Sequence, residues 1–568
     1  MNGPGDRASK TLSQRAPTFS SNARGHDRTP IRADVEYRCT SGSKSSARSQ
    51  MSSAREPGDL AETLAPIAGA GQPREGQQPQ AVDQGEESDA GMVPKKSAKA
   101  RVTPVESMEG RAAAKGKSAA RNAFSTQREM DAPTVLQRIG QRAKNKPEEK
   151  WNNLLSHIRV PLLELAYRKL RKKAAAGVDE VTWVGYGERL DERLADLEDR
   201  IHSGSYHPHP VRRVHIPKGD GQERPLGIPA LEDKIVQQAA RMILEPIYEA
   251  EFLGFSYGYR PKRSAHNALD ALAEVIARKV SWVLDADIRS FFDTIEHRWM
   301  QRFLEHRLGD TRMVRLLMKW MRTGVMEDDK LHEVDAGTPQ GGNISPLLAN
   351  LYLHYVFDLW VASWRRKHAR GEVYIVRYAD DLVMAFQHEQ DARAMRVALA
   401  ARLEQFGLEL HPEKTRVIRF GRFARLNHRE QGLGKPETFD FLGFTHIAAV
   451  SREGKFQLKR RTSRKKRRAK LASLGKEIRR RRHHYVADQH AWLNSVLIGH
   501  FRYYGVPTNY PALAQFRRHV HWMWLRSLQR RSQRARWTNT KLRAHEERFP
   551  LAKPHIHHPW PTDRFALR

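Results

Sequence analysis

Hydrophobic residues recur at two different spacings along the chain, and these spacings separate it into regions. Residues 132–158 and 160–177 carry apolar positions at helical spacing beside basic faces, which predicts helices. From Val211 onward, short β-branched runs alternate with long helical segments. After Lys455 basic helical segments dominate up to about residue 544. The pattern predicts an α/β or α+β domain followed by a more helical one, and we expect the α+β class.

The first 130 residues lack this pattern. They are rich in Ser, Ala, Gly, Arg, Gln and Pro, and every tryptophan lies at or after Trp151. Such a segment buries too little apolar surface to offset its chain entropy, so we expect disorder. An inert tail is the simpler expectation, and a basic arm that lies on nucleic acid is the alternative. The predicted domains are an arm, a mixed domain, a basic helical domain and a tail, at residues 1–130, 131–450, 451–550 and 551–568.

Two adjacent carboxylates, Asp380 and Asp381, interrupt the apolar run Val373–Phe386. One interpretation is a β-turn at Ala379–Asp381 between two strands, because Asp is common in turns. The other is a metal site, because like charges this close repel one another unless something binds between them. A third carboxylate from elsewhere in the chain would favour the metal.

The segment Trp282–Ile288 supplies that carboxylate. As a strand, it places Val283, Asp285 and Asp287 on one face. Carboxylate oxygens are the hard ligands that Mg²⁺ prefers. Two such ions, about 3.5–4 Å apart, clamp the attacking and leaving oxygens in phosphoryl transfer. The three acids therefore favour the metal chemistry of nucleic-acid polymerases.

The charge of the chain agrees with a nucleic-acid partner. Lys and Arg number 99 against 65 acidic residues, and the net charge of +34 favours a polyanion. An anionic membrane is the competing partner, but no apolar run approaches the roughly 18–20 residues of a membrane-spanning helix. The start of the chain also lacks the apolar core of a secretory signal. A single cysteine, Cys39, excludes a disulfide framework and cysteine-based zinc sites. These features predict a soluble, cytoplasmic nucleic-acid binder with no membrane partner.

Three motifs resemble the successive palm motifs of reverse transcriptases: "DADIRSFFD" (285–293), "AGTPQGGNISPLLANLYLH" (336–354) and "RYADDLVM" (377–384). The chain is most similar to the bacterial group II intron-encoded reverse transcriptase/maturases, from about Leu162 to its end. The resemblance implies a right-hand polymerase with fingers, palm and thumb, followed by a basic maturase region. The ending "KPHIHHPWPTDRFALR" resembles a branch that lacks the HNH endonuclease. We therefore expect this protein not to cut the second DNA strand itself.

The resemblance also implies roles for single residues. Asp287, Asp380 and Asp381 would ligate two catalytic Mg²⁺ ions, while Asp285 would be solvated or support the ligands. The implied nucleotide contacts are the triphosphate clamp Lys218 and Arg224 on the predicted hairpin 215–229, the 2′-OH-excluding ring of Phe292, Gln340 beside the incoming nucleotide, and Lys414 near the leaving pyrophosphate. The implied nucleic-acid contacts are Arg260 and Arg263 on the template, Gly341 and Gly443 at close backbone approaches, and Arg517 and Arg518 in the basic helical region.

For several of these residues a plainer interpretation stays open. Lys218, Arg224 and Lys414 would also suit a solvated surface, and Phe292 would also suit a core. In the basic helical region, Trp522 and Trp524 are expected in the aromatic core of a helix bundle.

The predicted function is RNA-directed DNA synthesis from a DNA primer or target with dNTPs, joined to maturase activity. The protein would bind group II intron RNA to promote splicing and mobility by target-primed reverse transcription, as a nucleoid-associated ribonucleoprotein. One alternative is a reverse transcriptase of a defence or diversity-generating system. Another is an RNA-binding maturase without polymerase activity. No feature of the sequence sets the oligomeric state.

Overall fold

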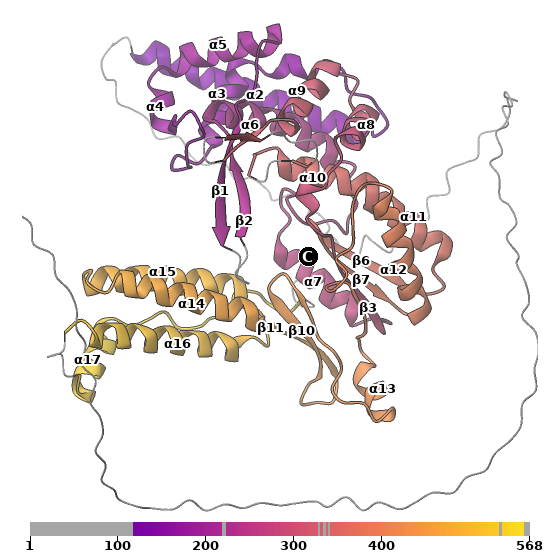
Figure 1. The fold of residues 1–568 in the computed structure, drawn as a ribbon, viewed down its shortest axis with the longest axis vertical. Helices are drawn as coiled ribbons and strands as arrows, with labels where there is room; N and C mark the ends of the chain where they lie inside the picture. The colour runs from indigo at the N-terminus through magenta and orange to yellow at the C-terminus, as the bar shows by residue number, and fades with distance from the viewer. Residues whose placement is uncertain are drawn as a thin grey trace, which may run out of the picture. The chain divides into compact units, whose positions relative to one another are not determined.

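The computed structural model describes residues 118–217, 223–327, 330–332, 337–338, 341–532 and 537–561 of the chain (Figure 1). Within these ranges, side chains are described from Ala132 onward, except those of Pro217 and Arg224. The predicted arm, residues 1–130, lies outside this part except for the backbone of a helix that begins at Ser118.

The first described helices pack together because each buries an apolar stripe. In α6 the buried residues Ile235, Ala239, Met242 and Ile243 recur at three- and four-residue spacing. Helix α3 packs against α5 and α6, and α2 packs against α3 and α6. The bounds are α2 (Ser118–Asn145), α3 (Val160–Lys169), α4 (Trp183–Gly187), α5 (Leu190–Ser203) and α6 (Leu231–Glu249).

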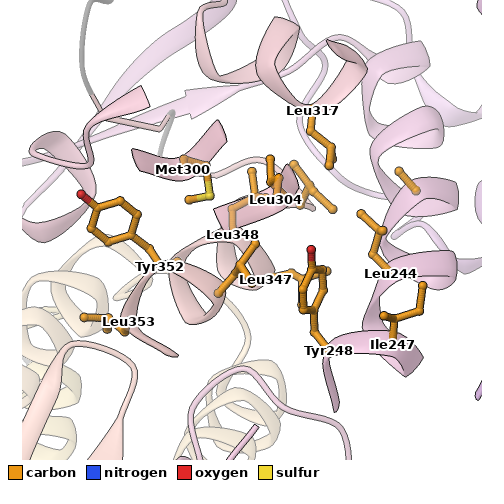
Figure 2. Close-up of a cluster of buried hydrophobic side chains, with 14 of the residues drawn as sticks. Leu244, Ile247, Tyr248, Met300, Leu304, Leu317, Leu347, Leu348, Tyr352 and Leu353 are labelled. Carbon is orange, nitrogen blue, oxygen red and sulfur yellow. The ribbon is translucent and has the colours of Figure 1, made fainter. Parts of the chain in front are cut away.

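The largest hydrophobic core joins these helices to the centre of the chain. Figure 2 shows Leu244 and Tyr248 of α6 facing Leu347 and Leu348 of α10, with Leu304 of α8 beside them. Each of these side chains is at most 5% exposed, so the packing fixes how the helices cross. The further helices of this part are α7 (Ala265–Ile276), α8 (His297–Arg307), α9 (Thr311–Met321), α10 (Ser345–Leu353), α11 (Leu359–His368) and α12 (Glu389–Glu404).

The central sheet is antiparallel with the strand order β6-β7-β3-β8. Its strands are β3 (Trp282–Asp287), β6 (Val373–Tyr378), β7 (Asp381–Phe386) and β8 (Arg416–Arg419). Alternate residues enter different cores: Leu284 and Met384 enter the largest core, whereas Val283 and Val383 enter a second one. Both faces are therefore covered, and the predicted strands 282–288 and 373–378 and the hairpin tip at Ala379–Asp381 are confirmed.

The described residues form two smaller sheets besides the central one. The order of one is β2-β1-β4-β5, and β1 pairs antiparallel with β2, which confirms the hairpin predicted at residues 215–229. The order of the other is β11-β10-β9, and β10 pairs with β11 along its whole length. This last hairpin crosses residue 450, where composition predicted a domain boundary. The bounds are β1 (Val211–Pro217), β2 (Glu223–Ile228), β4 (Val325–Glu327), β5 (Lys330–His332), β9 (Phe439–Phe441), β10 (Phe444–Val450) and β11 (Phe456–Thr462).

The basic helical region contains three long helices around a third core (Figure 1): α14 (Arg464–Arg480), α15 (Val486–Tyr504) and α16 (Tyr510–Gln529). Trp524 is buried there, and its indole N–H donates to Gln489 Oε1 at 3.0 Å. Trp522 is 57% exposed, so the core position predicted for it is wrong. Leu551 packs into the same core, so the segment predicted as a separate tail begins inside this region.

The remaining elements are short: η1 (Leu155–His157), η2 (Phe291–Asp293), the π-helix η3 (His354–Asp358), α13 (Ala424–Glu430) and α17 (Asn539–Arg548). No helix in the described ranges has both the length and the apolarity needed to cross a bilayer.

Candidate active site

Four aspartates gather at one end of the central sheet, and we call them the carboxylate edge: Asp285, Asp287, Asp380 and Asp381. Asp287 ends β3, and Asp381 begins β7 directly opposite it in the antiparallel register. Asp380 precedes Asp381 at the hairpin tip, after Ala379 in the left-handed region at φ 56°. The tip is therefore both a turn and a place where acids from two segments meet.

Repulsion among these acids dominates the electrostatics of the edge. The Asp381 side chain reaches solvent, yet the protein atoms around its carboxyl, and then the charges of Asp380, Asp287 and Asp285, raise its pKa to about 7. Burial raises the pKa of Asp285 to about 6, although the Arg416 guanidinium lies 3.6 Å away and opposes the shift. Like charges held together in this way are stabilised by a bound cation.

The donor set fits a hard divalent cation, since it consists of carboxylate oxygens that repel one another. Within the described part of the chain, no three His, Cys, Asp or Glu side chains already form a group that would hold a metal. Lys414 Nζ donates to Asp287 Oδ2 at 2.7 Å, so this ligand candidate is paired with an ammonium group. The structure thus brings Lys414, a predicted substrate residue, to the carboxylate edge.

Phe291 and Phe292 follow β3, and the structure separates their environments. Phe291 is 3% exposed in the core, whereas Phe292 is half-buried and meets the Phe291 ring edge-on at 5.4 Å. The backbone N–H of Thr338 donates to the Phe292 carbonyl at 2.9 Å, which brings the glycine-rich loop against Phe292. Gln340, predicted beside the nucleotide, lies outside the described residues.

The predicted triphosphate clamp is described only in part. Lys218 lies outside the described residues, and Arg224 is paired with Ile216 in the β1–β2 hairpin, without a described side chain.

Gly341 has φ +127°, and a Cβ there would lie 2.4 Å from the Gly227 carbonyl oxygen. The backbone that Gly341 approaches closely is thus that of β2, so packing alone requires glycine here.

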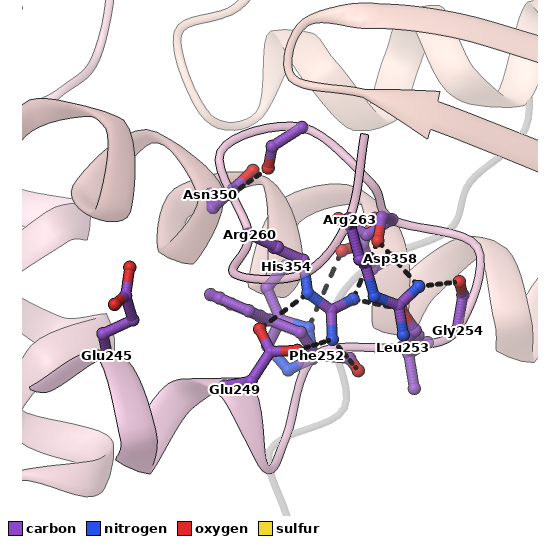
Figure 3. Close-up of polar contacts among 12 residues, drawn as sticks. Glu245, Glu249, Phe252, Leu253, Gly254, Arg260, Arg263, Asn350, His354 and Asp358 are labelled. Atoms are coloured by element: carbon purple, nitrogen blue, oxygen red, sulfur yellow. Dashed lines mark hydrogen bonds and ion pairs between the residues drawn. The ribbon is translucent and has the colours of Figure 1, made fainter. Parts of the chain in front are cut away.

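The predicted template contact of Arg260 is wrong in this structure. Residues 250–264, which we call the arginine loop, join α6 to α7. All five N–H donors of the Arg260 guanidinium are used: three bond the carbonyls of Phe252, Leu253 and Ser256, and two form a fork on the Glu249 carboxylate (Figure 3). The Arg260 side chain is 2% exposed, so no donor is left for a phosphate.

Arg263 lies in the same loop and is held less completely. Its Nη1 donates to the carbonyls of Gly254 (Figure 3) and Ser256. Its guanidinium lies over the Tyr257 ring. Because Arg263 is only half-buried, its template contact stays a prediction.

The nucleic-acid contacts predicted toward the chain's end also divide into two kinds. Leu442 and Gly443 both have positive φ and form the two-residue turn between β9 and β10. A Cβ on Gly443 would lie 2.9 Å from the Tyr504 hydroxyl, so this glycine is required by packing. Arg517 donates to the carbonyls of Leu551 and Ala552 and holds the segment that follows α17, whereas Arg518 is exposed.

Sequence patterns did not single out Arg416 beside Asp285 or the buried Arg377 beside the hairpin tip. Arg377 had one available signal, because it is the only charged residue in the apolar strand Val373–Tyr378. Its side-chain partners Asp358 and Asn350 lie 19 and 27 residues away in sequence and gave no such signal.

The geometry agrees with comparisons to known proteins. The family model for reverse transcriptase (RNA-dependent DNA polymerase) matches residues 216–446, which include Asp287, Asp380 and Asp381. Protein YkfC of Escherichia coli (strain K12) is 36% identical over 326 residues, which cover 50% of this chain and 85% of that protein. The chain belongs to the reverse transcriptase family.

Other relatives are named as intron proteins. The group II intron-encoded protein LtrA of Lactococcus lactis subsp. cremoris is 35% identical over 241 residues, 42% of this chain and 39% of LtrA. The putative COX1/OXI3 intron 1 protein of Saccharomyces cerevisiae is 29% identical over 279 residues, 48% of this chain and 31% of that protein. The chain thus spans about two fifths of LtrA and less of the yeast protein. These relatives confirm the resemblance found from the sequence.

Proposed function

We propose that this reverse transcriptase copies RNA into DNA and also acts as a group II intron maturase. The observation that carries the proposal is the register of Asp287 against Asp381, with Asp380 at the adjoining tip, inside the region matched by the family model. The relatives named as intron proteins support the group II intron part of the proposal.

Asp287, Asp380 and Asp381 are the residues that would hold two Mg²⁺ ions. When bound, such ions activate the primer 3′-OH and neutralise charge on the leaving pyrophosphate. The chain's own part is to keep the carboxylates together against their repulsion on two hydrogen-bonded strands. Lys414 is close enough to offer its proton or its charge to the same reaction.

Nucleotide selection falls to residues around this edge. The half-buried ring of Phe292 would leave no room for a ribose 2′-OH, which admits dNTPs and excludes rNTPs. Lys218, Arg224 and Gln340 complete the proposed nucleotide site, with Arg224 able to bind phosphate through two N–H groups.

Binding of intron RNA and of the RNA template with its DNA primer would use the basic helical region. Arg518 is exposed on α16, and Arg526 lies over the exposed Trp522 ring at 4.5 Å from its centroid. An exposed aromatic ring with a cation stacked on it suits RNA bases and phosphates together. Binding there would stabilise the folded intron for splicing.

Primer extension on an RNA template tests the proposal directly. The purified full chain is given Mg²⁺ with dNTPs or rNTPs, beside Asp380→Asn and a matched exposed control on α5, Asp199→Asn. We expect extension with dNTPs only, lost in Asp380→Asn and kept in Asp199→Asn. Tight binding of structured RNA without any extension by the unmodified chain would contradict the polymerase and leave a maturase alone.

A further inference from the structure

A buried arginine holds the hairpin tip that carries the catalytic acids. Arg377 is the last buried residue of β6 and is 0% exposed, as is its partner Asp358 in the π-helix η3. The Arg377 Nε and Nη2 donate to the two Asp358 carboxylate oxygens at 2.7 and 2.5 Å. This is the forked geometry in which the guanidinium is fixed in its plane.

The remaining hydrogen bonds of this guanidinium lead to the tip. Arg377 Nη1 donates to Asn350 Oδ1 at 3.0 Å and to the carbonyl of Ala379 at 3.2 Å. Ala379 directly precedes Asp380 and has the left-handed φ of 56° that a residue with a Cβ rarely adopts. A hydrogen bond to that carbonyl therefore stabilises a backbone conformation that the sequence alone does not favour.

The same tip is held from its other side. Asn350 Nδ2 donates to the Gly258 carbonyl at 2.6 Å, and a Cβ on Gly258 would lie 2.3 Å from the Ala379 nitrogen. The arginine loop also bonds the backbone of Arg377: its N–H donates to the Phe255 carbonyl, and the Tyr257 N–H donates to its carbonyl, both at 2.9 Å. Asn350 thus links the guanidinium to the loop that presses on Ala379.

Stability by itself does not explain this arrangement. A buried ion pair costs desolvation of both charges, and well-packed apolar residues in its place are often no less stable. A charged pair whose spare donor is aimed at a strained carbonyl beside two catalytic acids has a more specific use.

We propose that Arg377 is a positioning residue of this reverse transcriptase. Asp358 and Asn350 hold its guanidinium, the guanidinium fixes the Ala379 carbonyl, and the tip then presents Asp380 and Asp381 toward Asp287. The inference rests on the proposed function, because the direction of the tip matters only if these carboxylates catalyse nucleotide addition.

The test replaces the ion pair by apolar residues of similar size in the full chain, Arg377→Met with Asp358→Leu. Removing both charges together leaves neither charge of the pair unpaired, so we expect only a modest fall in melting temperature, caused by the Asn350 and Ala379 oxygens that lose their donor. We expect kcat for single-nucleotide incorporation to fall about 10- to 100-fold, since small misplacements of catalytic groups have effects of this size. The KM for dNTP should stay within about twofold, because Arg377 does not contact the nucleotide. Binding of Mn²⁺ to the substrate-free protein, followed by electron paramagnetic resonance, should weaken in parallel.

A matched control makes the same chemical change elsewhere. Arg460 and Asp270 form another buried pair at 2.9 Å, between β11 and α7. The double variant Arg460→Met with Asp270→Leu should keep both kcat per folded molecule and Mn²⁺ binding. An equal loss of kcat in this control would mean that removing any buried ion pair lowers kcat. The effect would then not depend on the hairpin tip, and the proposal would be overturned.

The outcomes separate the two proposals. Wild-type kcat and Mn²⁺ binding in the Arg377→Met, Asp358→Leu variant would overturn the positioning role. If that variant fails to fold, Asn350→Leu keeps the ion pair but frees Gly258, and we expect a smaller loss of kcat, which a wild-type value would contradict. An inactive wild type would refute the proposed function itself, and the inference with it.

Discussion

The carboxylate edge and the arginine loop show opposite ways of treating charge within one molecule. At the edge, four acids of like sign come together, and crowding and repulsion raise the pKa of Asp381 to about 7. In the loop, every donor of Arg260 has an acceptor and nothing is left for a ligand. Like charges that are held close together despite their repulsion indicate a functional site. A charge whose hydrogen bonds are all made within the protein indicates a structural role.

The largest effect expected from this comparison is in activity at the edge. Asp381→Asn should lower the rate of nucleotide incorporation by at least about 1,000-fold, or about 4 kcal/mol of transition-state stabilisation. In EDTA the same change should raise the melting temperature by about 1–3 °C, because one repelling charge is gone. Single-turnover kinetics and thermal unfolding measure the two effects. A variant that is both inactive and less stable would contradict the view that repulsion at the carboxylate edge lowers the stability of the fold.

The arginine loop should respond in the opposite way. Arg260→Met leaves Glu249 and three backbone carbonyls without their donor, so we expect the free energy of unfolding to fall by about 3 kcal/mol. Urea unfolding measures this loss. The salt dependence of RNA binding by the folded protein should not change, since Arg260 reaches no phosphate. A shallower salt dependence would restore the template contact that the structure argues against.

A buried histidine tests the structural side of this comparison, because an uncharged group in a core should affect the pH dependence of stability. His446 is fully buried and stacked on Phe439 at 4.8 Å, and burial, aided by the charge of Arg460, lowers its pKa to about 3. Its pKa is about 6.5 when unfolded, so the unfolded chain binds the extra proton first. Stability is therefore lost as the pH falls from about 6.5 toward 3, by up to about 1.4 kcal/mol per pH unit. His446→Phe should flatten the stability profile in this range, and an unchanged slope would show that other groups cause it.

The smallest effect is expected at the neighbouring pair Arg517 and Arg518. Arg518→Gln should make the fall of log affinity for structured RNA with log salt shallower, by about 0.7–0.9 in the slope, and leave the melting temperature unchanged. Arg517→Gln should instead lower the melting temperature, because it loses the carbonyls of Leu551 and Ala552. Filter binding at several salt concentrations, beside thermal unfolding, separates the two. The reverse pattern would contradict the division between exposed and structural arginines.

The parts of the fold that sequence predicted well depend on local pattern. The alternation in Trp282–Ile288 and the β-branched apolar run Val373–Phe386 predicted the three strands β3, β6 and β7, and the acids within these segments indicated the site. Trp522 was misplaced although the signal was there. Phe516, Val520, Trp524 and Leu528 recur every four residues, and Trp522 lies on the opposite side of that helix.

Other features had no local signal. The partners of Arg260 include three backbone carbonyls, which no residue type announces. The hairpin of β10 and β11 crosses the boundary at residue 450, because strand pairing does not follow the change in composition. Arg377 depends on Asp358 and Asn350, which only the folded chain brings near Ala379.

Single-nucleotide incorporation on an RNA template by the wild type and Asp287→Asn, at matched concentrations of folded protein, tests the central claim most directly. Asp287 lies opposite Asp381 and its carboxylate is paired with Lys414. Replacing Asp287 therefore affects both the proposed metal site and Lys414, the proposed proton or charge donor. We predict dNTP incorporation by the wild type and none by the variant, with the same affinity for primer–template. Incorporation by Asp287→Asn at the wild-type rate would show that the carboxylate edge is not the catalytic centre.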